Sequence, residues 1–504
     1  MNEILIPDLS NQTSSLLPYL MVAGGALLVM LVDSFVRTMK KDHLSYLTLF
    51  VLIGTVVVQI IGDQGDKVLL NGMMVTNDFT FFFNYLFCGI AVMTTIYATG
   101  LFDREGRYRP EFYPLILLST LGMMVLVASN DLITLFLGLE TMSLATYVLA
   151  GGVRGNIKSS EAGFKYLILG GFSSAFLLMG MALVYGFAGG TGFADISAAL
   201  KSAHPDMTFV SIGSGMMLVG FGFKIAMVPF HMWTPDVYEG APSYITGFMS
   251  TAIKAAGFAI LLRFAILMQP QLGFVWFPVL SVLAVLTMSI GNLVALVQSN
   301  MKRMLAWSSI AHAGYLMLGV LTFISPSAGG TEMMMRTREL GGAAGSAVLF
   351  YLIGYALMNL AAFGIINVLG NKKGEDGDQI SRYAGLGRTR PLAAVTMLVA
   401  MLSLAGIPPM VGFMAKFYLL QAVVQAGMVP LAIIAVINSL ISVYYYLRVI
   451  VMMYFHEPEE NSYRGTEWVS VVTSSVLALL IIYLGVMPGA FHRAAEVIFR
   501  NLVF

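Results

Sequence analysis

Four charged side chains lie deep inside apolar stretches of this sequence. Insertion scales put the cost of a charge at the centre of a membrane helix at about 2.5–3.5 kcal/mol, so each one needs a chemical reason. A lysine in a low-dielectric site binds its proton weakly, and a nearby carboxylate restores that affinity. A carboxylate and several lysines in a row could therefore accept a proton, hold it and pass it on. The four residues are Glu140, Lys224, Lys254 and Lys416.

Lysine rather than arginine occupies all three basic positions. This choice favours proton transfer over permanent ion pairing, because arginine does not lose its proton in proteins. Glu140 and Lys224, if adjacent, would form a pair whose separation makes Lys224 release its proton. Two other interpretations stay open. Glu140 is also explained as a carboxyl group that burial keeps neutral or that is paired for packing, and Lys224 as a lysine that extends to the membrane surface beside a purely structural kink.

Two of the lysines lie beside a predicted break in a membrane helix. In the stretch "FGFKIAMVPFHMWTPDVYEGAP", Pro229 follows Lys224 by five residues. Proline lacks an N–H group and clashes with the carbonyl four residues earlier, so we expect the helix to break and its freed carbonyls to lie near the lysine. In "GIPPMVGFMAK", Lys416 follows Pro408 and Pro409. The same combination therefore occurs twice.

Two histidines and three further cations also lie in or near the apolar stretches. Histidine is a residue type that titrates near neutral pH, so His231 and His312 are candidate proton relays, although a hydrogen-bonded core residue explains each equally well. Lys165, Arg263 and Arg448 lie nearer the ends of their stretches. Contact with water or with lipid headgroups is expected there.

The composition is that of an integral membrane protein. The chain has 504 residues, of which 58% are hydrophobic and 11% charged, and its mean hydropathy is +0.81. Soluble domains usually have about 25% charged residues. A net charge of +1 offers no electrostatic basis for binding nucleic acid. Cys88 is the single cysteine, which excludes an intrachain disulfide and a cysteine cluster for a metal or an iron–sulfur centre. The sequence also has no dinucleotide or Walker motif, so we expect this chain to bind no metal and no cofactor.

The apolar stretches predict the topology. A membrane span needs about 20 apolar residues. Fourteen candidates lie at roughly 15–36, 44–62, 79–101, 112–128, 131–150, 161–188, 208–232, 243–268, 274–297, 303–323, 345–369, 391–425, 429–455 and 467–488. The twelfth is too long for one straight helix. Odd-numbered loops carry 16 of the 28 Lys and Arg residues and the even-numbered loops and termini about 6, so both termini are predicted to face away from the cytoplasm. The N-terminus lacks a basic segment, so we expect no cleavable signal.

Weak internal sequence similarities suggest how the chain is divided. Ser129–Asn130 and Ser299–Asn300 each precede a span, "YLI" opens two others, and the proline breaks recur at a similar offset. Together they suggest two five-helix units, a common plan in transporters. We therefore divide the chain into N-terminal helices (1–111), a first unit (112–268), a second unit (274–455) and a C-terminal helix with its tail (467–504).

Four motifs resemble those of a known family: the Lys–Pro stretch quoted above, "GLETMSL", "KRMLAWSSIAHAGY" and "LAGIPPMVGFMAKFYL". They are similar to the antiporter-like subunits of respiratory complex I, the type I NADH:quinone oxidoreductase, and within them to the subunit N group, the bacterial counterpart of mitochondrial subunit 2. The resemblance spans roughly residues 15–488. It implies an all-α polytopic membrane protein of about 14 transmembrane helices. Spans 4–8 and 9–13 would be inverted five-helix repeats, and spans 7 and 12 would be broken.

The resemblance also implies roles for the charged residues. Glu140 would be the carboxylate coupled to the proton carrier Lys224. Lys254 would be a central relay, and Lys416 the carrier of the outward half. The histidines complete the set: His312 fits the polar axis that links the half-channels, and His231 matches the first motif.

The implied function is that of a proton-translocating subunit of an enzyme complex. Electron transfer from NADH, or a related donor, to quinone would drive the pumping, with NADH, FMN, iron–sulfur clusters and quinone held in partner subunits. Expected partners are the neighbouring antiporter-like and small membrane subunits and the lipid bilayer of the bacterial inner membrane. Two alternatives stay open: a cation/proton antiporter subunit of the multisubunit type without redox coupling, and a structural membrane scaffold.

Overall fold

Helices make up nearly all of the protein. The computed structural model describes residues 12–35, 43–62, 65–105, 109–202, 207–325, 331–369, 378–458 and 468–500. In this part of the chain the strands are limited to one antiparallel hairpin, β1 (Lys67–Leu69) and β2 (Met74–Thr76). The longer helices are α1 (Thr13–Phe35), α2 (His43–Ile61), α3 (Asp78–Glu105), α4 (Phe112–Ala128), α5 (Leu132–Ala150), α6 (Ile157–Ala188), α8 (Thr208–Ile225), α11 (Lys254–Leu296), α12 (Met301–Ile324), α13 (Thr331–Leu369), α15 (Pro391–Ala405), α16 (Val411–Gln425), α17 (Val429–Phe455) and α18 (Trp468–Val486).

Shorter helical elements connect or extend these helices. The α-helical ones are α7 (Phe193–Lys201), α9 (Trp233–Gly240), α10 (Ser243–Phe248), α14 (Leu386–Thr389) and α19 (Gly489–Arg500). The others are the 3-10 turns η1 (Leu70–Gly72) and η3 (Ile380–Tyr383) and the π-helical turn η2 (Met249–Ile253). Neither the hairpin nor α7, α9 and α19 was predicted, because these segments are shorter than the apolar stretches of about 20 residues from which the spans were predicted.

The predicted spans coincide with these helices. Twelve segments of the described chain are long and apolar enough to cross a membrane, and α4, α15 and α16 are shorter apolar helices. α4 is the predicted fourth span, and α15 and α16 are the two halves of the twelfth, which confirms its break. The eighth and ninth spans form α10, η2 and the long α11. The expectation of an all-α membrane fold with about fourteen spans is therefore confirmed.

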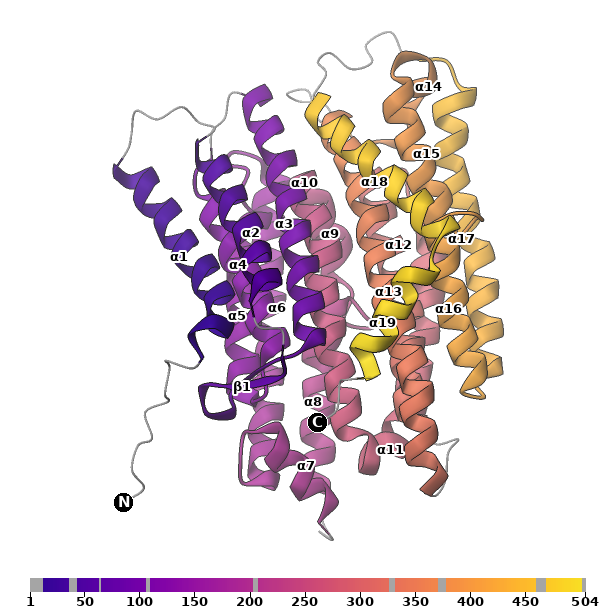
Figure 1. Cartoon of the computed structure of the whole chain (residues 1–504). Helices are drawn as coiled ribbons and strands as arrows, with labels where there is room; N and C mark the ends of the chain where they lie inside the picture. The colour runs from indigo at the N-terminus through magenta and orange to yellow at the C-terminus, as the bar shows by residue number, and fades with distance from the viewer. Residues whose placement is uncertain are drawn as a thin grey trace.

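Lys254 and His312 lie on two of the most buried helices. Figure 1 shows the first part of the chain on one side of the bundle and α12 to α18 on the other. In the apolar window of Ser243–Met268, which holds Lys254, 94% of the residues are buried, and the same share holds for Met301–Ile324, which holds His312. The corresponding share is 33% for α6 and α17, which present their apolar faces outward. Two of the predicted proton-handling groups thus lie at the centre of the bundle.

Glycines bring α4 and α5 into direct backbone contact. A Cβ atom on Gly122 would lie 2.3 Å from the backbone nitrogen of Met142, and one on Gly138 would lie 2.6 Å from that of Leu126. Small residues allow membrane helices to approach in this way, because van der Waals packing holds them together. Gly138 lies two residues before Glu140, so this contact also fixes the position of Glu140.

Substitution of Gly122 by leucine is expected to separate α4 from α5. The added side chain would meet backbone that cannot move aside, so we expect a destabilisation of about 3 kcal/mol or more. The amount of folded chain in membranes and its thermal unfolding temperature measure the effect. Gly171→Leu on α6 is the matched control, because no heavy atom lies within 4 Å of a Cβ at that position. Equal accumulation of both variants would contradict the prediction.

Two arginines donate hydrogen bonds to backbone carbonyls at helix ends inside the bundle. Arg263 is 3% exposed and donates hydrogen bonds to the backbone carbonyls of Val127 (2.8 Å) and Ser129, where α4 ends. Arg448 donates in the same way to the carbonyl of Leu296 (3.0 Å), where α11 ends. Carbonyls at a helix C-terminus lack internal partners and carry partial negative charge, so a cation stabilises them. The expectation that Arg263 reaches water or headgroups is therefore wrong.

Candidate functional site

Lys224 lies in a cage of hydroxyl and aromatic groups at the end of α8. It is 3% exposed, and its Nζ donates hydrogen bonds to Ser143 Oγ (2.7 Å) and Tyr147 OH (3.2 Å) on α5. The rings of Tyr147, Tyr166 and Phe223 lie 5.3, 5.9 and 5.6 Å from this nitrogen. Ring faces attract a cation, so the cage can hold the protonated amine without a carboxylate in contact.

The first helix break lies directly after this lysine. α8 ends at Ile225, Ala226 adopts a left-handed conformation with φ +61°, and α9 begins at Trp233. Pro229 lies between the two helices, as predicted, and follows a cis peptide bond. Freed carbonyls were expected near Lys224. The polar partners of its Nζ are instead the two hydroxyl groups of α5.

Freed carbonyls do hold the lysine at the second break. α15 ends at Ala405 and α16 begins at Val411, with Pro408 and Pro409 between them. Lys416 Nζ donates to the carbonyls of Leu404 (3.2 Å) and Ala405 (3.1 Å). It also donates to Ser439 Oγ on α17 (3.0 Å). The broken helix therefore supplies the acceptors for this ammonium group.

Glu140 lies on the same helix as the partners of Lys224. Its carboxylate accepts a short hydrogen bond from Ser174 of α6. Ser143 and Tyr147 follow it by three and seven residues, which places all three side chains on one face of α5. Among the described residues, no ion pair joins Glu140 to Lys224, and the hydrogen-bond partner of Lys224 one helical turn from Glu140 is Ser143. That spacing is the signal by which Ser143 and Tyr147 could have been found in the sequence.

Lys254 follows a π-helical turn and contacts α12. The turn is η2, and π-turns inside α-helices are frequent at functional sites. Lys254 is 2% exposed, and its Nζ donates to both the backbone carbonyl and the hydroxyl of Ser309. The ring of Tyr355 lies 5.4 Å from the same nitrogen. Here too an ammonium group is held by neutral acceptors.

His312 lies between two tyrosine hydroxyls. Its Nδ1 is 2.6 Å from Tyr351 OH, and its Nε2 is 3.2 Å from Tyr446 OH, which in turn contacts Ser308 Oγ. The ring is 2% exposed and within electrostatic reach of both Lys254 and Lys416. A chain of hydroxyl and imidazole groups therefore runs through the centre of the bundle, and each ring nitrogen of His312 has a partner able to exchange a proton.

His231 stands apart from that chain. It lies in the connection between α8 and α9, where its ring meets the edge of Trp307 at a centroid distance of 5.4 Å. The structure therefore joins His312, but not His231, by hydrogen bonds to a wider polar network.

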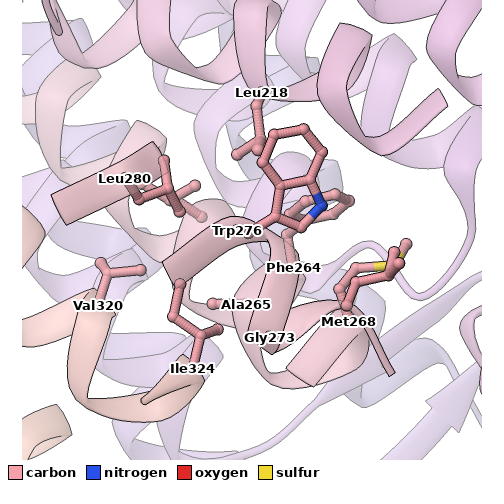
Figure 2. A pocket seen from close by; sticks show the side chains of 11 residues that line it. Leu218, Phe264, Ala265, Met268, Gly273, Trp276, Leu280, Val320 and Ile324 are labelled. Carbon is pink, nitrogen blue, oxygen red and sulfur yellow. The ribbon is translucent and has the colours of Figure 1, made fainter. Parts of the chain in front are cut away.

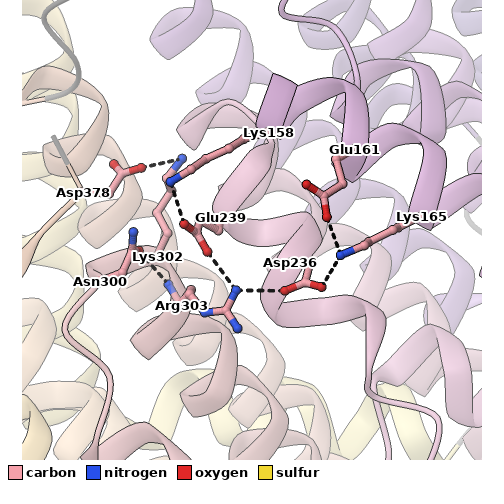
Figure 3. Close-up of polar contacts among 9 residues, drawn as sticks. All are labelled: Lys158, Glu161, Lys165, Asp236, Glu239, Asn300, Lys302, Arg303 and Asp378. Atoms are coloured by element: carbon pink, nitrogen blue, oxygen red, sulfur yellow. Dashed lines mark hydrogen bonds and ion pairs between the residues drawn. The ribbon is translucent and has the colours of Figure 1, made fainter. Parts of the chain in front are cut away.

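An ion-pair network covers the end of the bundle where α6 and α12 begin. Asp236 of α9 lies 2.7 Å from Lys165 of α6 and 2.8 Å from Arg303 of α12. Glu239 lies 2.8 Å from the same arginine and 3.0 Å from Lys158. Figure 3 shows the two carboxylates lying between cations from both sides. Lys165 is thus ion-paired while 38% of its side chain stays exposed, and sequence analysis missed this network.

The two carboxylates stay ionised at neutral pH. Burial raises the pKa of Asp236, but hydrogen bonds from Lys165 and Arg303 outweigh it and hold the pKa below its ordinary value of 3.8. The same balance, with Arg303 and Lys158, holds the pKa of Glu239 below 4.5. A pKa lower in the folded than in the unfolded state stabilises the fold above the unfolded value, and this contribution is lost as the pH falls through the folded value.

The stabilising effect of Asp236 is therefore expected to vanish in acid. Asp236→Asn should lower the unfolding free energy near neutral pH by about 1 kcal/mol, since these side chains are about one-third exposed. The difference in unfolding temperature between wild type and variant should shrink as the pH falls below 3.8. A difference that persists unchanged in acid would show that the effect does not come from ionisation.

The structure also contains an apolar pocket away from these charges. It has an empty volume of about 300 Å³ and is lined by apolar side chains of α8, α11 and α12 (Figure 2). Trp276 lies in its wall and donates a hydrogen bond to Ser214 Oγ (3.2 Å). A proton path needs polar groups, so this pocket is no part of one. Among the described residues, no group of three His, Cys, Asp or Glu side chains could hold a metal ion.

Comparison with known proteins places this arrangement in a family. Residues 129–442 match the family described as "NADH:quinone oxidoreductase/Mrp antiporter, TM". NADH-quinone oxidoreductase subunit N of Trichlorobacter lovleyi is 46% identical over 472 residues, which cover 93% of this chain and 92% of the relative. Subunit N of Desulfitobacterium hafniense is 41% identical over 468 residues, covering 91% and 92%.

Solved structures show the same fold. A chain of respiratory complex I from Thermus thermophilus with bound aureothin has a TM-score of 0.78 and 31% identity, covering 94% of this chain and 98% of its own. A chain of the Mrp complex from Dietzia has a TM-score of 0.81 at 22% identity, covering 97% of both, which supports the fold alone. The matched stretch includes both helix breaks and all four predicted charges, and by its relatives this chain belongs to the subunit N family of the antiporter-like membrane subunits of NADH:quinone oxidoreductase.

Proposed function

We propose that this chain translocates protons across the membrane as a subunit of complex I, while partner subunits transfer electrons to quinone. The observation that supports this most directly is the environment of the three buried lysines. Lys224, Lys254 and Lys416 are each held by hydroxyl or carbonyl oxygens, and the described residues include no carboxylate within ion-pair distance of them. A buried amine with neutral partners can lose and regain its proton more easily than one locked in an ion pair.

We assign the proton-carrying steps to the predicted residues. Protonated Lys224 is stabilised by the hydroxyl groups of Ser143 and Tyr147, and Glu140, one helical turn away on α5, adjusts its proton affinity. A proton released at Lys224 passes to Lys254, which Ser309 holds at the centre. These steps belong to the first unit of the chain.

The second unit continues the path. His312 exchanges a proton through its two ring nitrogens with Tyr351 and Tyr446. Lys416 then holds the proton at the second helix break, where Ser439 Oγ and two backbone carbonyls accept its N–H groups. His231 is a candidate relay through its place two residues after Pro229, at the first break, rather than through a hydrogen bond to this path.

We extend the proposal to the partners, the topology and the domains. NADH or a related donor, FMN, iron–sulfur clusters and quinone belong to partner subunits in this scheme, because the sequence has none of the motifs that would hold them. An even number of spans and the distribution of basic residues favour both termini on the non-cytoplasmic side of the bacterial inner membrane. A reporter enzyme active only in the cytoplasm, fused to the C-terminus, should be inactive. The boundaries 1–111, 112–268, 274–455 and 467–504 remain our division of the chain.

An antiporter without redox coupling is the second candidate. It is favoured by the family description, which names Mrp antiporters together with the oxidoreductase, and by the fold shared with the Dietzia Mrp chain. The relatives at 46% and 41% identity carry the oxidoreductase name, which favours the first candidate.

Proton transport by the reconstituted complex separates the two candidates. With NADH and a quinone, liposomes holding the complex should transport protons, and Lys254→Met should lower transport and quinone reduction together by about tenfold or more. Arg154→Gln is the matched control, because Arg154 forms an exposed ion pair with Glu111. Proton exchange driven by a sodium gradient alone, with no effect of quinone, would favour the antiporter.

A further inference from the structure

The short helix α9 lies between the ion-pair network and the Lys224 cage. α9 has eight residues, too few for a helix that is stable by itself, so its position depends on its contacts. One side of α9 carries Asp236 and Glu239, which are three residues apart and therefore lie on the same face. Both carboxylates bind cations of two other helices, α6 and α12.

The cations that hold α9 come from both halves of the chain. Lys158 and Lys165 belong to the first five-helix unit, and Arg303 belongs to the second. Arg303 bridges both carboxylates, with N–O distances of 2.8 Å to Asp236 and to Glu239. A displacement of α6 against α12 would therefore have to break or stretch an ion pair on α9.

A buried lysine fixes the end of α9. Lys302 Nζ donates a hydrogen bond to the carbonyl of Ala241, the residue that follows the helix, at 3.1 Å. The same nitrogen lies 3.0 Å from Asp378, and these two side chains are only 6% and 7% exposed. An ion pair this buried is costly to disrupt, because either partner alone would be an uncompensated buried charge. α9 is thus held along its length and at its C-terminal end.

The start of α9 closes the cage around Lys224. Trp233, at the start of the helix, stacks on Tyr166 with a centroid distance of 4.5 Å and an interplanar angle of 7°. Its Nε1 donates to the carbonyl of Phe223, the residue before Lys224, at 3.0 Å. Tyr166 in turn contacts Tyr147, a hydrogen-bond partner of Lys224. Tyr166 is also the chain neighbour of Lys165, which pairs with Asp236.

We propose that α9 is a cover over the Lys224 site, and that Asp236 and Glu239 are positioning residues that hold it closed through cations of both halves of the chain. With the ion pairs intact, Trp233 and Tyr166 separate Lys224 from the end of the bundle where α6 and α12 begin. Loss of the pairs releases α9, parts the Trp233–Tyr166 stack and admits water to Lys224 from that end. The consequence for pumping rests on the proposed function, whereas the cover itself does not.

The accessibility of a cysteine on α9 tests this inference. Thr234 is fully buried next to Trp233, and Cys88 is the only native cysteine of the chain. The complex with Cys88→Ala and Thr234→Cys is treated in membrane vesicles with a membrane-impermeant methanethiosulfonate reagent, and modification is followed on this chain by mass spectrometry. Adding Asp236→Asn and Glu239→Gln should raise the modification rate by about tenfold or more, because the open form becomes more populated.

Controls make the outcome specific. Glu111→Gln, which removes an exposed ion pair elsewhere, should leave the rate unchanged, and Asp236→Glu should largely restore the slow rate. Equal modification rates with and without the double substitution would overturn the inference that α9 is a cover. If the double variant does not assemble, Trp233→Phe tests the same point, because it removes the Nε1 donor while keeping an aromatic ring. An unchanged rate in that variant would likewise overturn the inference.

The two proposals can fail separately. The labelling rate depends on neither proton transport nor quinone. A Lys224 substitution that leaves proton transport unchanged would therefore refute the proposed function without affecting the labelling result. An unaffected labelling rate would refute the cover while proton transport through Lys224 stands. If both hold, Asp236→Asn should also lower proton transport, and adding Glu239→Gln should lower it further because Glu239 forms its own ion pairs with Arg303 and Lys158.

Discussion

Replacing Lys224 with alanine is expected to reduce proton uptake and quinone reduction together, by about tenfold or more, in inverted vesicles where the complex still assembles. The substitution removes the amine that is held in the cage formed by Ser143, Tyr147, Tyr166 and Phe223. Without Lys224, the proton path loses the amine that is coupled to Glu140. Both activities are expected to fall because a coupled enzyme cannot turn over with one obligatory step blocked.

Lys224→Arg distinguishes proton exchange from simple charge. Arginine keeps the positive charge and can still donate to the hydroxyl groups, but it does not release its proton. We therefore expect it to be about as inactive as alanine. Lys201→Ala, at the exposed end of α7, is the matched control and should behave as wild type. Full activity of Lys224→Arg would exclude proton exchange at this position, and full activity of Lys224→Ala would redirect attention to antiport without redox coupling.

Substitution of Lys416 by methionine is expected to have a comparable effect at the second helix break. Methionine has a similar length and no charge, so packing changes little while the titratable amine is lost. The carbonyls of Leu404 and Ala405 and the hydroxyl of Ser439 lose their common donor. We expect proton transport to fall by about tenfold or more.

Ser439→Ala is compared with Lys416→Met and is expected to reduce proton transport less. Ser439→Ala removes one of the three acceptors of Lys416 and leaves the two carbonyls, so it should cost far less than the loss of the amine. The two variants are compared by proton transport in reconstituted liposomes at matched amounts of assembled complex. Unchanged transport in Lys416→Met would show that the second break holds a structural lysine, which is what the scaffold interpretation predicts.

The charged row was visible in the sequence because its signals are local. A charge within about 20 apolar residues is costly wherever the helix packs, so Glu140 and Lys254 stood out without a structure. Proline breaks a helix through its own covalent geometry, which is why the interruptions at Pro229 and Pro408 were predicted correctly. The membrane class and the approximate number of spans follow from composition and hydrophobic runs in the same way.

The partners of these charges were not visible in the sequence. Lys224 contacts hydroxyls on α5, 77 and 81 residues away in the chain, rather than carbonyls of its own broken helix. Arg263 looked like a cation near the membrane surface, but it is buried against the end of α4. The local sequence shows which charged groups are costly to bury. The hydrogen-bond partner that offsets this cost depends on long-range packing.

The sequence by itself determined that this is a membrane protein with four deep charges, two broken helices and the motifs of its family. Only the tertiary structure decided which oxygen atoms receive each ammonium group, that His312 joins a tyrosine network while His231 does not, and that α9 lies between an ion-pair network and Lys224. The physical reason is the range of the interactions. Burial cost and backbone geometry act over a few residues, but hydrogen bonds and ion pairs in a helical bundle join segments that meet only when the chain has folded.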